Sequence, residues 1–223
     1  MAHDDGLVLR ELPFWHFPST LCVGGRIIPI RTDFRVGIRL RELWGERYYL
    51  HRQRLLFMKT AELLAADEAG AAAMLRDPED MAEAVLWYLM DGRVDRKTLS
   101  NRLARQNTVM SHTDTEKRSE GLFSYKWDMP LLYASFLAVY QMDLLKCGYL
   151  HLWQFDALFY ALPRDCALMQ KMEWRKFDLS EIKDDGMRAQ AAAEKVRCRI
   201  PSDDKLIQMC NDTHLCETIN MEG

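Results

Sequence analysis

Residues 148–163 read Gly-Tyr-Leu-His-Leu-Trp-Gln-Phe-Asp-Ala-Leu-Phe-Tyr-Ala-Leu-Pro, and this stretch decides the fold class. Its apolar side chains are dense and recur at helical spacing, and Pro163 ends the helix because proline cannot continue it. A helix this apolar must be covered by other helices or by a partner. We therefore predict a helix over 148–162 within a mainly α-helical protein.

A second apolar helix is predicted just before this one. Asp128 is placed as its N-cap, with Pro130 in the first turn, where the missing N–H costs little. Leu132, Phe136 and Val139 then recur at i, i+4 and i+7, so they share one face of the helix. The two helices are predicted to form the centre of the core.

Earlier helices are predicted from capping signals and periodicity. Residues 77–80, Asp-Pro-Glu-Asp, combine a capping carboxylate, a proline at the first helical position and acids that suit the helix dipole. They predict a helix over 81–90 that is apolar on nearly every side. A longer helix is predicted over 47–66 from three apolar residues at seven-residue spacing: Tyr49, Leu56 and Leu63.

The N-terminal part contains the one predicted β element. Residues 21–30 place β-forming side chains on both sides of Gly24-Gly25, which can supply the positive φ angles of a tight hairpin turn. Pro29 fits an edge position because it cannot donate a ladder hydrogen bond. Thr32-Asp33 is the predicted N-cap of a short helix ending near Gly45, with an apolar stripe of Phe34, Ile38 and Leu43 or Trp44.

Polar composition marks the remaining segments. Residues 92–122 predict a mobile polar connector, and a more polar helix is predicted from Asp178 to Arg197. The predicted fold is a compact helical domain over residues 21–201 that begins with a short β-hairpin. An N-terminal extension, 1–20, and a loosely held tail, 202–223, flank it.

Composition excludes several broad classes of protein. The chain has 223 residues, 48% hydrophobic and 28% charged, with a formal net charge of −3 that gives no overall bias toward nucleic acid. Six cysteines without framework spacing predict reduced thiols. The N-terminus lacks a signal-peptide pattern, and no uncharged run reaches the roughly 20 residues of a membrane span. We expect an intracellular protein.

Few residues suggest catalysis, metal binding or a cofactor. No P-loop or dinucleotide-binding glycine motif follows a predicted strand. Cys210, His214 and Cys216 lie close together, but zinc sites need a second ligand cluster, which is missing. Cys147 and His151 are four residues apart and could form a thiol–imidazole pair on one helical face, although a buried thiol and a capping histidine explain them better. We predict a protein that is not an enzyme and has no cofactor or metal.

Two groups of residues are candidates for binding a macromolecule. The aromatic residues of the 148–162 helix occur both in cores and at interface hot spots: Tyr149, Trp153, Phe155, Phe159 and Tyr160. A basic segment could contact phosphates if it formed a helix, although a solvated connector is the plainer interpretation: Arg93, Arg96, Lys97, Arg102 and Arg105. The first group favours protein binding, and the second leaves nucleic-acid binding as the alternative.

Several motifs follow one another in a characteristic order: residues 24–36 (GGRIIPIRTDFRV), 84–90 (AVLWYLM), 150–165 (LHLWQFDALFYALPRD) and 177–184 (FDLSEIKD). This order of motifs resembles the bacteriophage gene-product-fifteen family of siphophage tail-module proteins. It implies a tail assembly chaperone that binds the phage tape measure protein before the tail tube polymerises. Other tail chaperone subunits, an oligomeric state and the host cell cytoplasm are implied as well. No catalytic residue is carried over, and a phage nucleic-acid-binding or regulatory protein that uses Arg93–Arg105 remains the alternative.

Overall fold

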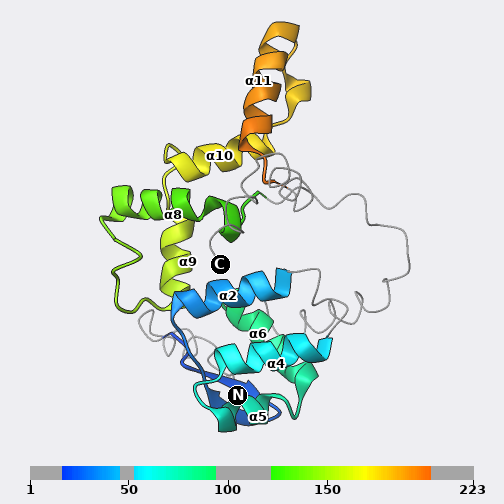
Figure 1. Ribbon diagram of the computed structural model, residues 1–223, viewed down its shortest axis with the longest axis vertical. Helices are drawn as coiled ribbons and strands as arrows, with labels where there is room; N and C mark the ends of the chain where they lie inside the picture. The colour runs from blue at the N-terminus through cyan, green and yellow to red at the C-terminus, as the bar shows by residue number, and fades with distance from the viewer. Residues whose placement is uncertain (1–16, 46–52, 94–121, 202–223) are drawn as a thin grey trace, which may run out of the picture. The chain divides into compact units, whose positions relative to one another are not determined.

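The computed structural model describes residues 17–45, 53–93 and 122–201 (Figure 1). The protein is mainly helical with one two-stranded antiparallel hairpin among these residues, as the sequence predicted. The chain divides into two compact units, the first containing residues 1–113 and 147–161 and the second containing 114–146 and 162–223. The prediction of one helical domain over residues 21–201, flanked by an N-terminal extension and a C-terminal tail, stays a prediction.

The first unit begins with the predicted hairpin. Strands β1, Thr20–Val23, and β2, Arg26–Pro29, pair antiparallel with Thr20 opposite Pro29. Gly24 and Gly25 both have positive φ, +55° and +71°, which is the backbone that a right-twisted two-residue turn requires. The hairpin interpretation of Gly24-Gly25 is therefore confirmed.

Helices of the first unit surround a core to which the hairpin contributes. They are α2, Phe34–Gly45; α4, Gln53–Leu64; α5, Glu68–Met74; α6, Pro78–Leu89; and α9, Leu152–Tyr160. Helix α2 packs against α4 and α9, while α5 and α6 pack against the hairpin. Gly37 allows α2 to approach α9 closely, because a Cβ at this position would collide with the Leu152 side chain. The largest fully buried side chains of this unit include Tyr88, Phe155, Leu40, Leu64, Met74 and Met81.

The predicted start of α6 is confirmed. The Asp77 side chain accepts a hydrogen bond from the Asp80 N–H at 3.2 Å, and Pro78 is the first helical residue. The helix predicted over 47–66 is described from Gln53 to Leu64, with Leu56 buried, whereas Tyr49 lies outside the described residues. Helix α5 was not predicted.

The second unit contains α8, Tyr125–Tyr140; α10, Ala167–Lys176; a short 3₁₀ turn η1, Leu179–Glu181; and α11, Asp185–Cys198. Helix α10 packs against both α8 and α11. Arg175 on α10 is buried and donates to Asp128 of α8 at 2.6 and 2.8 Å. It also donates to the carbonyls of Leu122 and Cys198 at 2.7 and 2.5 Å, so one guanidinium joins four parts of the unit.

The predicted role of Asp128 as an N-cap is wrong. Helix α8 starts one turn earlier, after Ser124, and Pro130 lies inside it. Asp128 instead accepts from the Ser124 N–H at 2.9 Å and pairs with Arg175, and its side chain is fully buried. The local sequence pattern predicted a helix start at this carboxylate, because a single sequence does not show that Arg175 is its long-range partner. Val139 is also 37% exposed rather than buried, although Leu132 and Phe136 lie in the core as predicted.

Two other predicted helices have different limits. The segment predicted as one helix from Asp178 contains η1, capped by Asp178, and then α11, capped by Asp184. Helix α9 begins at Leu152 rather than near residue 148, because the preceding residues pair with the α2 entry: Phe34 N–H donates to Leu150 O, and Leu152 N–H to Thr32 O, both at 2.9 Å. Helix α10 was not predicted.

Within the described residues, no helix combines the length and the apolar character needed to cross a membrane.

Candidate protein-binding site

The N-terminus of α9 is fixed by His151. The His151 Nδ1 accepts from the Trp153 N–H at 3.0 Å, and the Gln154 side chain accepts from the His151 N–H at 3.2 Å, which makes a reciprocal capping box. Because Nδ1 is an acceptor, the ring hydrogen belongs on Nε2, which lies 3.1 Å from the Pro18 carbonyl and donates to it. Burial lowers the pKa of His151, so the neutral ring is favoured.

The thiol–imidazole interpretation of Cys147 and His151 is therefore wrong. The two residues do not share a helical face, because Cys147 precedes α9 and both ring nitrogens of His151 have structural partners. The Cys147 sulfur lies 3.4 Å from the Arg35 guanidinium, which also donates to the Cys147 carbonyl at 2.7 Å. The arrangement fixes a loop and offers no imidazole base to the thiol.

Trp153 packs against the end of α6 and forms a hydrogen bond with it. Its indole N–H donates to the Tyr88 carbonyl at 2.8 Å, and its ring meets Trp87 edge to face with centroids 5.4 Å apart. Gly92, with a φ of +66°, follows α6, and a Cβ there would lie 3.1 Å from both indole rings. A side chain at residue 92 would therefore crowd both indoles, and the missing Cβ favours their close packing.

A partly buried ion cluster joins the helices that carry these aromatic rings. Arg41 of α2 forms a bidentate pair with Asp156 of α9 at 2.6 and 2.5 Å and donates to the Leu89 carbonyl at 2.8 Å. Asp91 lies 4.0 Å from Arg41 and 3.4 Å from Arg93. Burial, followed by the neighbouring Asp156, raises the pKa of Asp91 to about 7, against the opposite influence of Arg41 and Arg93. The cluster ties α2, α6 and α9 together.

The five aromatic candidates have different environments. Tyr149 and Tyr160 are exposed, at 63% and 62%, and Trp153 and Phe159 are half-buried. Phe155 is fully buried and stacks on Phe34 with centroids 4.8 Å apart, so it is a core residue that no partner can reach in this structure. The Tyr149 hydroxyl is paired with Thr32 at 2.6 Å.

Two residues that the sequence interpretation left out belong to the end of α6 that lies beside Trp153. Trp87, half-buried, and Met90, 39% exposed, come from the end of α6 and its cap. On α9, Trp153 and Tyr160 are seven residues apart and therefore share a face. We name Trp87, Met90, Trp153 and Tyr160 the aromatic surface. The sequence contained a signal for this surface. The helix predicted over 81–90 is apolar on nearly every side, and its neighbours cannot cover all of it.

Of the predicted basic segment, Arg93 is described and the rest is not. Its guanidinium lies 4.8 Å from the Tyr160 ring centroid and 3.4 Å from the Asp91 carboxylate, and the side chain is 62% exposed. Arg93 therefore borders the aromatic surface. The remaining basic candidates, Arg96, Lys97, Arg102 and Arg105, lie outside the described residues, as do Cys210, His214 and Cys216. The described part of the chain contains no cluster of three or more potential metal ligands.

Comparison with known proteins gives one family. A family model described as "Bacteriophage Gp15 protein" matches residues 17–196. No curated protein and no solved structure matches this chain. The matched range includes all the residues of the aromatic surface and of the ion cluster.

Proposed function

Because this chain belongs to the bacteriophage Gp15 protein family, we propose that it is a tail assembly chaperone that binds the phage tape measure protein before the tail tube forms. It acts by binding and not by catalysis. Its partners are the tape measure protein and other tail chaperone subunits, and it works in the host cell cytoplasm during phage assembly. The observation that carries the proposal is the aromatic surface on α6 and α9.

The aromatic surface suits an apolar helix. Tryptophan and tyrosine are enriched in interface hot spots, and methionine is enriched at interfaces in general. An amphipathic helix presents such a stripe at i, i+3, i+4 and i+7. A tape measure protein is a long helical chain whose apolar stripes would aggregate before the tail tube encloses it. Covering those stripes is the physical task of the chaperone.

The surface is also held rigid before binding. The Trp153 indole is fixed by its bond to the Tyr88 carbonyl, and Gly92 lets Trp87 pack beside it. The Arg41–Asp156 pair holds α9 against α2. A partner then loses less conformational entropy in ordering these side chains, which favours binding by a surface of modest size.

The first test is co-expression with the tape measure protein of the same phage, followed by a solubility comparison and a pull-down. We expect the tape measure protein to become soluble and to co-purify with several copies of this chain. An insoluble and unbound tape measure protein contradicts the proposal and makes nucleic-acid binding the leading function. A salt titration identifies that alternative, since phosphate contacts weaken steeply as salt increases.

A matched pair of variants tests the surface itself. Met90 and Met58 are equally exposed, at 39% and 40%, but Met58 lies on α4 and outside the aromatic surface. We expect Met90→Lys to reduce tape measure solubilisation and Met58→Lys to leave it unchanged. Trp153→Ala should abolish solubilisation in protein that circular dichroism shows to be folded. Unchanged solubilisation by both Met90→Lys and folded Trp153→Ala would place the binding site elsewhere.

A further inference from the structure

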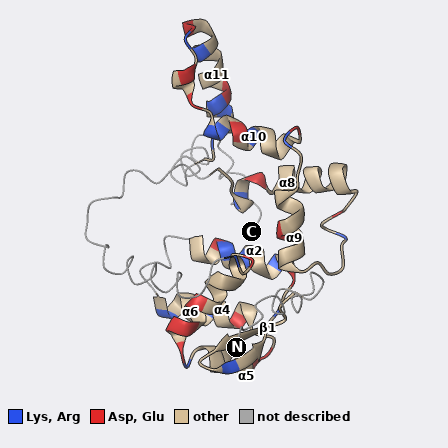
Figure 2. Ribbon diagram, turned by 180° about the vertical axis from the view of Figure 1, so that it is seen from behind, with Lys and Arg blue, Asp and Glu red and all other residues tan. Residues whose placement is uncertain are grey.

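The two helices that carry the aromatic surface contain no lysine or arginine. The charged residues of α6 are Glu79, Asp80 and Glu83, and α9 has Asp156. Over the whole chain the two signs nearly balance, with 30 lysines and arginines against 33 acids, so the acidic character belongs to these helices in particular. Figure 2 colours the acids of α6 red. The charge beside the aromatic surface can therefore indicate its partner.

The acids of α6 continue its exposed side. Glu83 lies one helical turn before Trp87, and Glu79 lies one turn before Glu83. Glu79 is exposed and Glu83 is half-buried, whereas Met81 and Tyr88 on the opposite side of the helix are buried. The exposed side of α6 thus presents acids along its first part and the apolar side chains of the aromatic surface along its end.

The carboxylates of Glu79 and Glu83 have no internal role in holding the fold. Within the described part of the chain, their side chains have no ion-pair or hydrogen-bond partner. Asp80 differs, because it accepts from the Gly24 N–H at 2.6 Å and holds the hairpin turn. The helix dipole favours an acid at Glu79 in the first turn, but this effect has faded by Glu83. Glu83 is therefore available to a charge on another chain.

The nearby arginines already have acids of their own. Arg41 forms its bidentate pair with Asp156, and Arg93 lies 3.4 Å from Asp91. These two pairs balance, so they leave the acids of α6 uncompensated. Arg93 also lies 4.8 Å from the Tyr160 ring centroid, which shows that a ring of the aromatic surface accepts a guanidinium.

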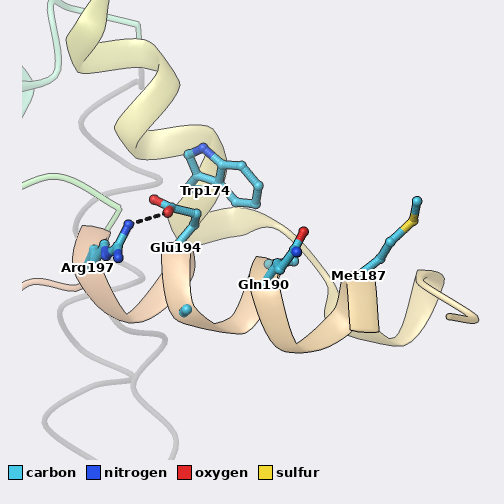
Figure 3. A pocket seen from close by; sticks show the side chains of 7 residues that line it. Trp174, Met187, Gln190, Glu194 and Arg197 are labelled. Atoms are coloured by element: carbon cyan, nitrogen blue, oxygen red, sulfur yellow. Dashed lines mark hydrogen bonds and ion pairs between the residues drawn. The ribbon is translucent and has the colours of Figure 1, made fainter. Parts of the chain in front are cut away.

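An open groove beside Trp174 in the second unit makes a useful contrast (Figure 3). Its volume is about 460 Å³, and Glu194 and Arg197 line it next to the indole. These two side chains pair with each other at 2.5 Å. The groove therefore has an acid beside a tryptophan, as the aromatic surface has, but the acid is compensated and selects no partner by charge.

We propose that the aromatic surface selects a basic amphipathic helix, in which lysine or arginine continues the apolar stripe and lies against Glu83 and Glu79. Aromatic rings attract cations to their faces and carboxylates pair with them, so both parts of the surface favour the same partner. A helix with acids at these positions is disfavoured by like charge, and so is a nucleic acid backbone. The inference rests on the proposed binding of a helix at this surface and names the class of helix.

Two synthetic helical peptides that share one apolar stripe test the selection. One has lysines and the other has glutamates at positions one and two helical turns beyond the stripe. Isothermal titration into the full chain, at one low salt concentration, measures both affinities. We expect the lysine peptide to bind about fivefold or more tightly than the glutamate peptide. Equal affinities, or a tighter glutamate peptide, overturn this inference alone, whereas no binding of either peptide contradicts the proposed helix-binding surface as well.

Variants of the full chain locate the selection. Glu83→Lys should remove most of the preference for the lysine peptide, and Glu83→Gln, which keeps the size of the side chain, should reduce it. Glu194→Lys is the matched control, because it makes the same change of charge beside Trp174. It should keep the preference. Circular dichroism checks the fold of each variant. A preference that persists in folded Glu83 variants, or that Glu194→Lys also removes, overturns the proposal.

Discussion

Gly92 is the residue on which the packing of the aromatic surface depends. Its positive φ suits glycine, and its missing Cβ leaves room for the Trp87 and Trp153 rings. A side chain at this position therefore has two separate costs, backbone strain and displacement of the indoles. The two costs can be measured separately, because Gly25 also has a positive φ but has no atom close to the position that its Cβ would take.

Gly92→Ala is expected to destabilise the protein by about 1 kcal/mol or more beyond the effect of Gly25→Ala. Gly25 has a similar φ of +71°, and no atom lies within 4 Å of the position that its Cβ would take. Urea denaturation of the two variants measures the difference. Gly92→Ala should also shift tryptophan fluorescence, and equal stabilities with unchanged fluorescence would show that the indoles do not need the space.

Asp91 makes stability depend on pH in an unusual direction. Burial and the neighbouring Asp156 raise its pKa to about 7, so the folded protein holds this proton more tightly than the unfolded chain does. The resulting stabilisation is complete below the pKa of an unfolded carboxyl, near 4, and is lost as the pH rises toward 7. Asp91 also has a φ of +55°, which asparagine tolerates.

Asp91→Asn should therefore match the wild type near pH 4 and exceed it near pH 8, by roughly 1–2 kcal/mol. Thermal or urea unfolding at several pH values measures this, and the difference between the two proteins cancels the titration of His151 and other shared groups. Glu62→Gln, at an exposed position on α4, should give no such trend. A constant difference across the pH range would contradict the assigned pKa.

At the scale of elements, the sequence predicted those turns and helix starts that a few neighbouring residues determine. The Gly24-Gly25 turn and the Asp77-Pro78 start of α6 were readable because their causes lie within a few residues. Helices α5 and α10 were missed: the first is a short alanine-rich turn, and the second has little contrast between its faces. The contrast between an apolar face and a polar face is the main sequence signal for a helix, so helices without this contrast were not predicted.

Long-range pairs were invisible for a different reason. Arg41 and Asp156 are 115 residues apart, and Arg175 and Asp128 are 47 apart. Nothing in a single sequence says which arginine meets which aspartate. The same limit explains why Trp87 was not joined to Trp153 in the predicted site, although both aromatic helices had been recognised.

Helix α10 depends on Arg175 for its attachment to its neighbours. Burial alone would raise the pKa of Asp128, but the hydrogen bonds and charge of Arg175, the Ser124 N–H and Lys171 together hold it below its usual range. The carboxylate therefore stabilises the fold above the unfolded pKa, and this contribution is lost as the pH falls through the lower, folded pKa. Removing Arg175 leaves a buried carboxylate with Lys171 as its remaining cation, 3.4 Å away.

Arg175→Met should destabilise the second unit by about 2–4 kcal/mol, because breaking a buried pair leaves a charge uncompensated. The double variant Arg175→Met with Asp128→Asn should recover part of this loss. Arg188→Met removes an exposed pair with Asp185 and should cost less than about 0.5 kcal/mol. Urea denaturation measures the stability of all three variants. Equal losses of stability in Arg175→Met and Arg188→Met would show that the buried Arg175–Asp128 pair contributes no more than an exposed pair.

At the scale of the whole molecule, the aromatic surface belongs to the first of the two units of the chain. If each aromatic surface holds one stretch of a long helical partner weakly, many copies can cover that partner together. Coverage of the whole partner then depends on the affinity of each copy for its own stretch.

Met90→Lys tests this at the aromatic surface. It should weaken binding of a short tape measure fragment, with room for one copy, and should weaken binding per copy of a long segment by about the same factor, because each copy uses the same surface. Isothermal titration with fragments of increasing length measures both values, and Met58→Lys, at an equally exposed position outside the aromatic surface, is the control. An unchanged affinity for both lengths in Met90→Lys would mean that the partner binds elsewhere.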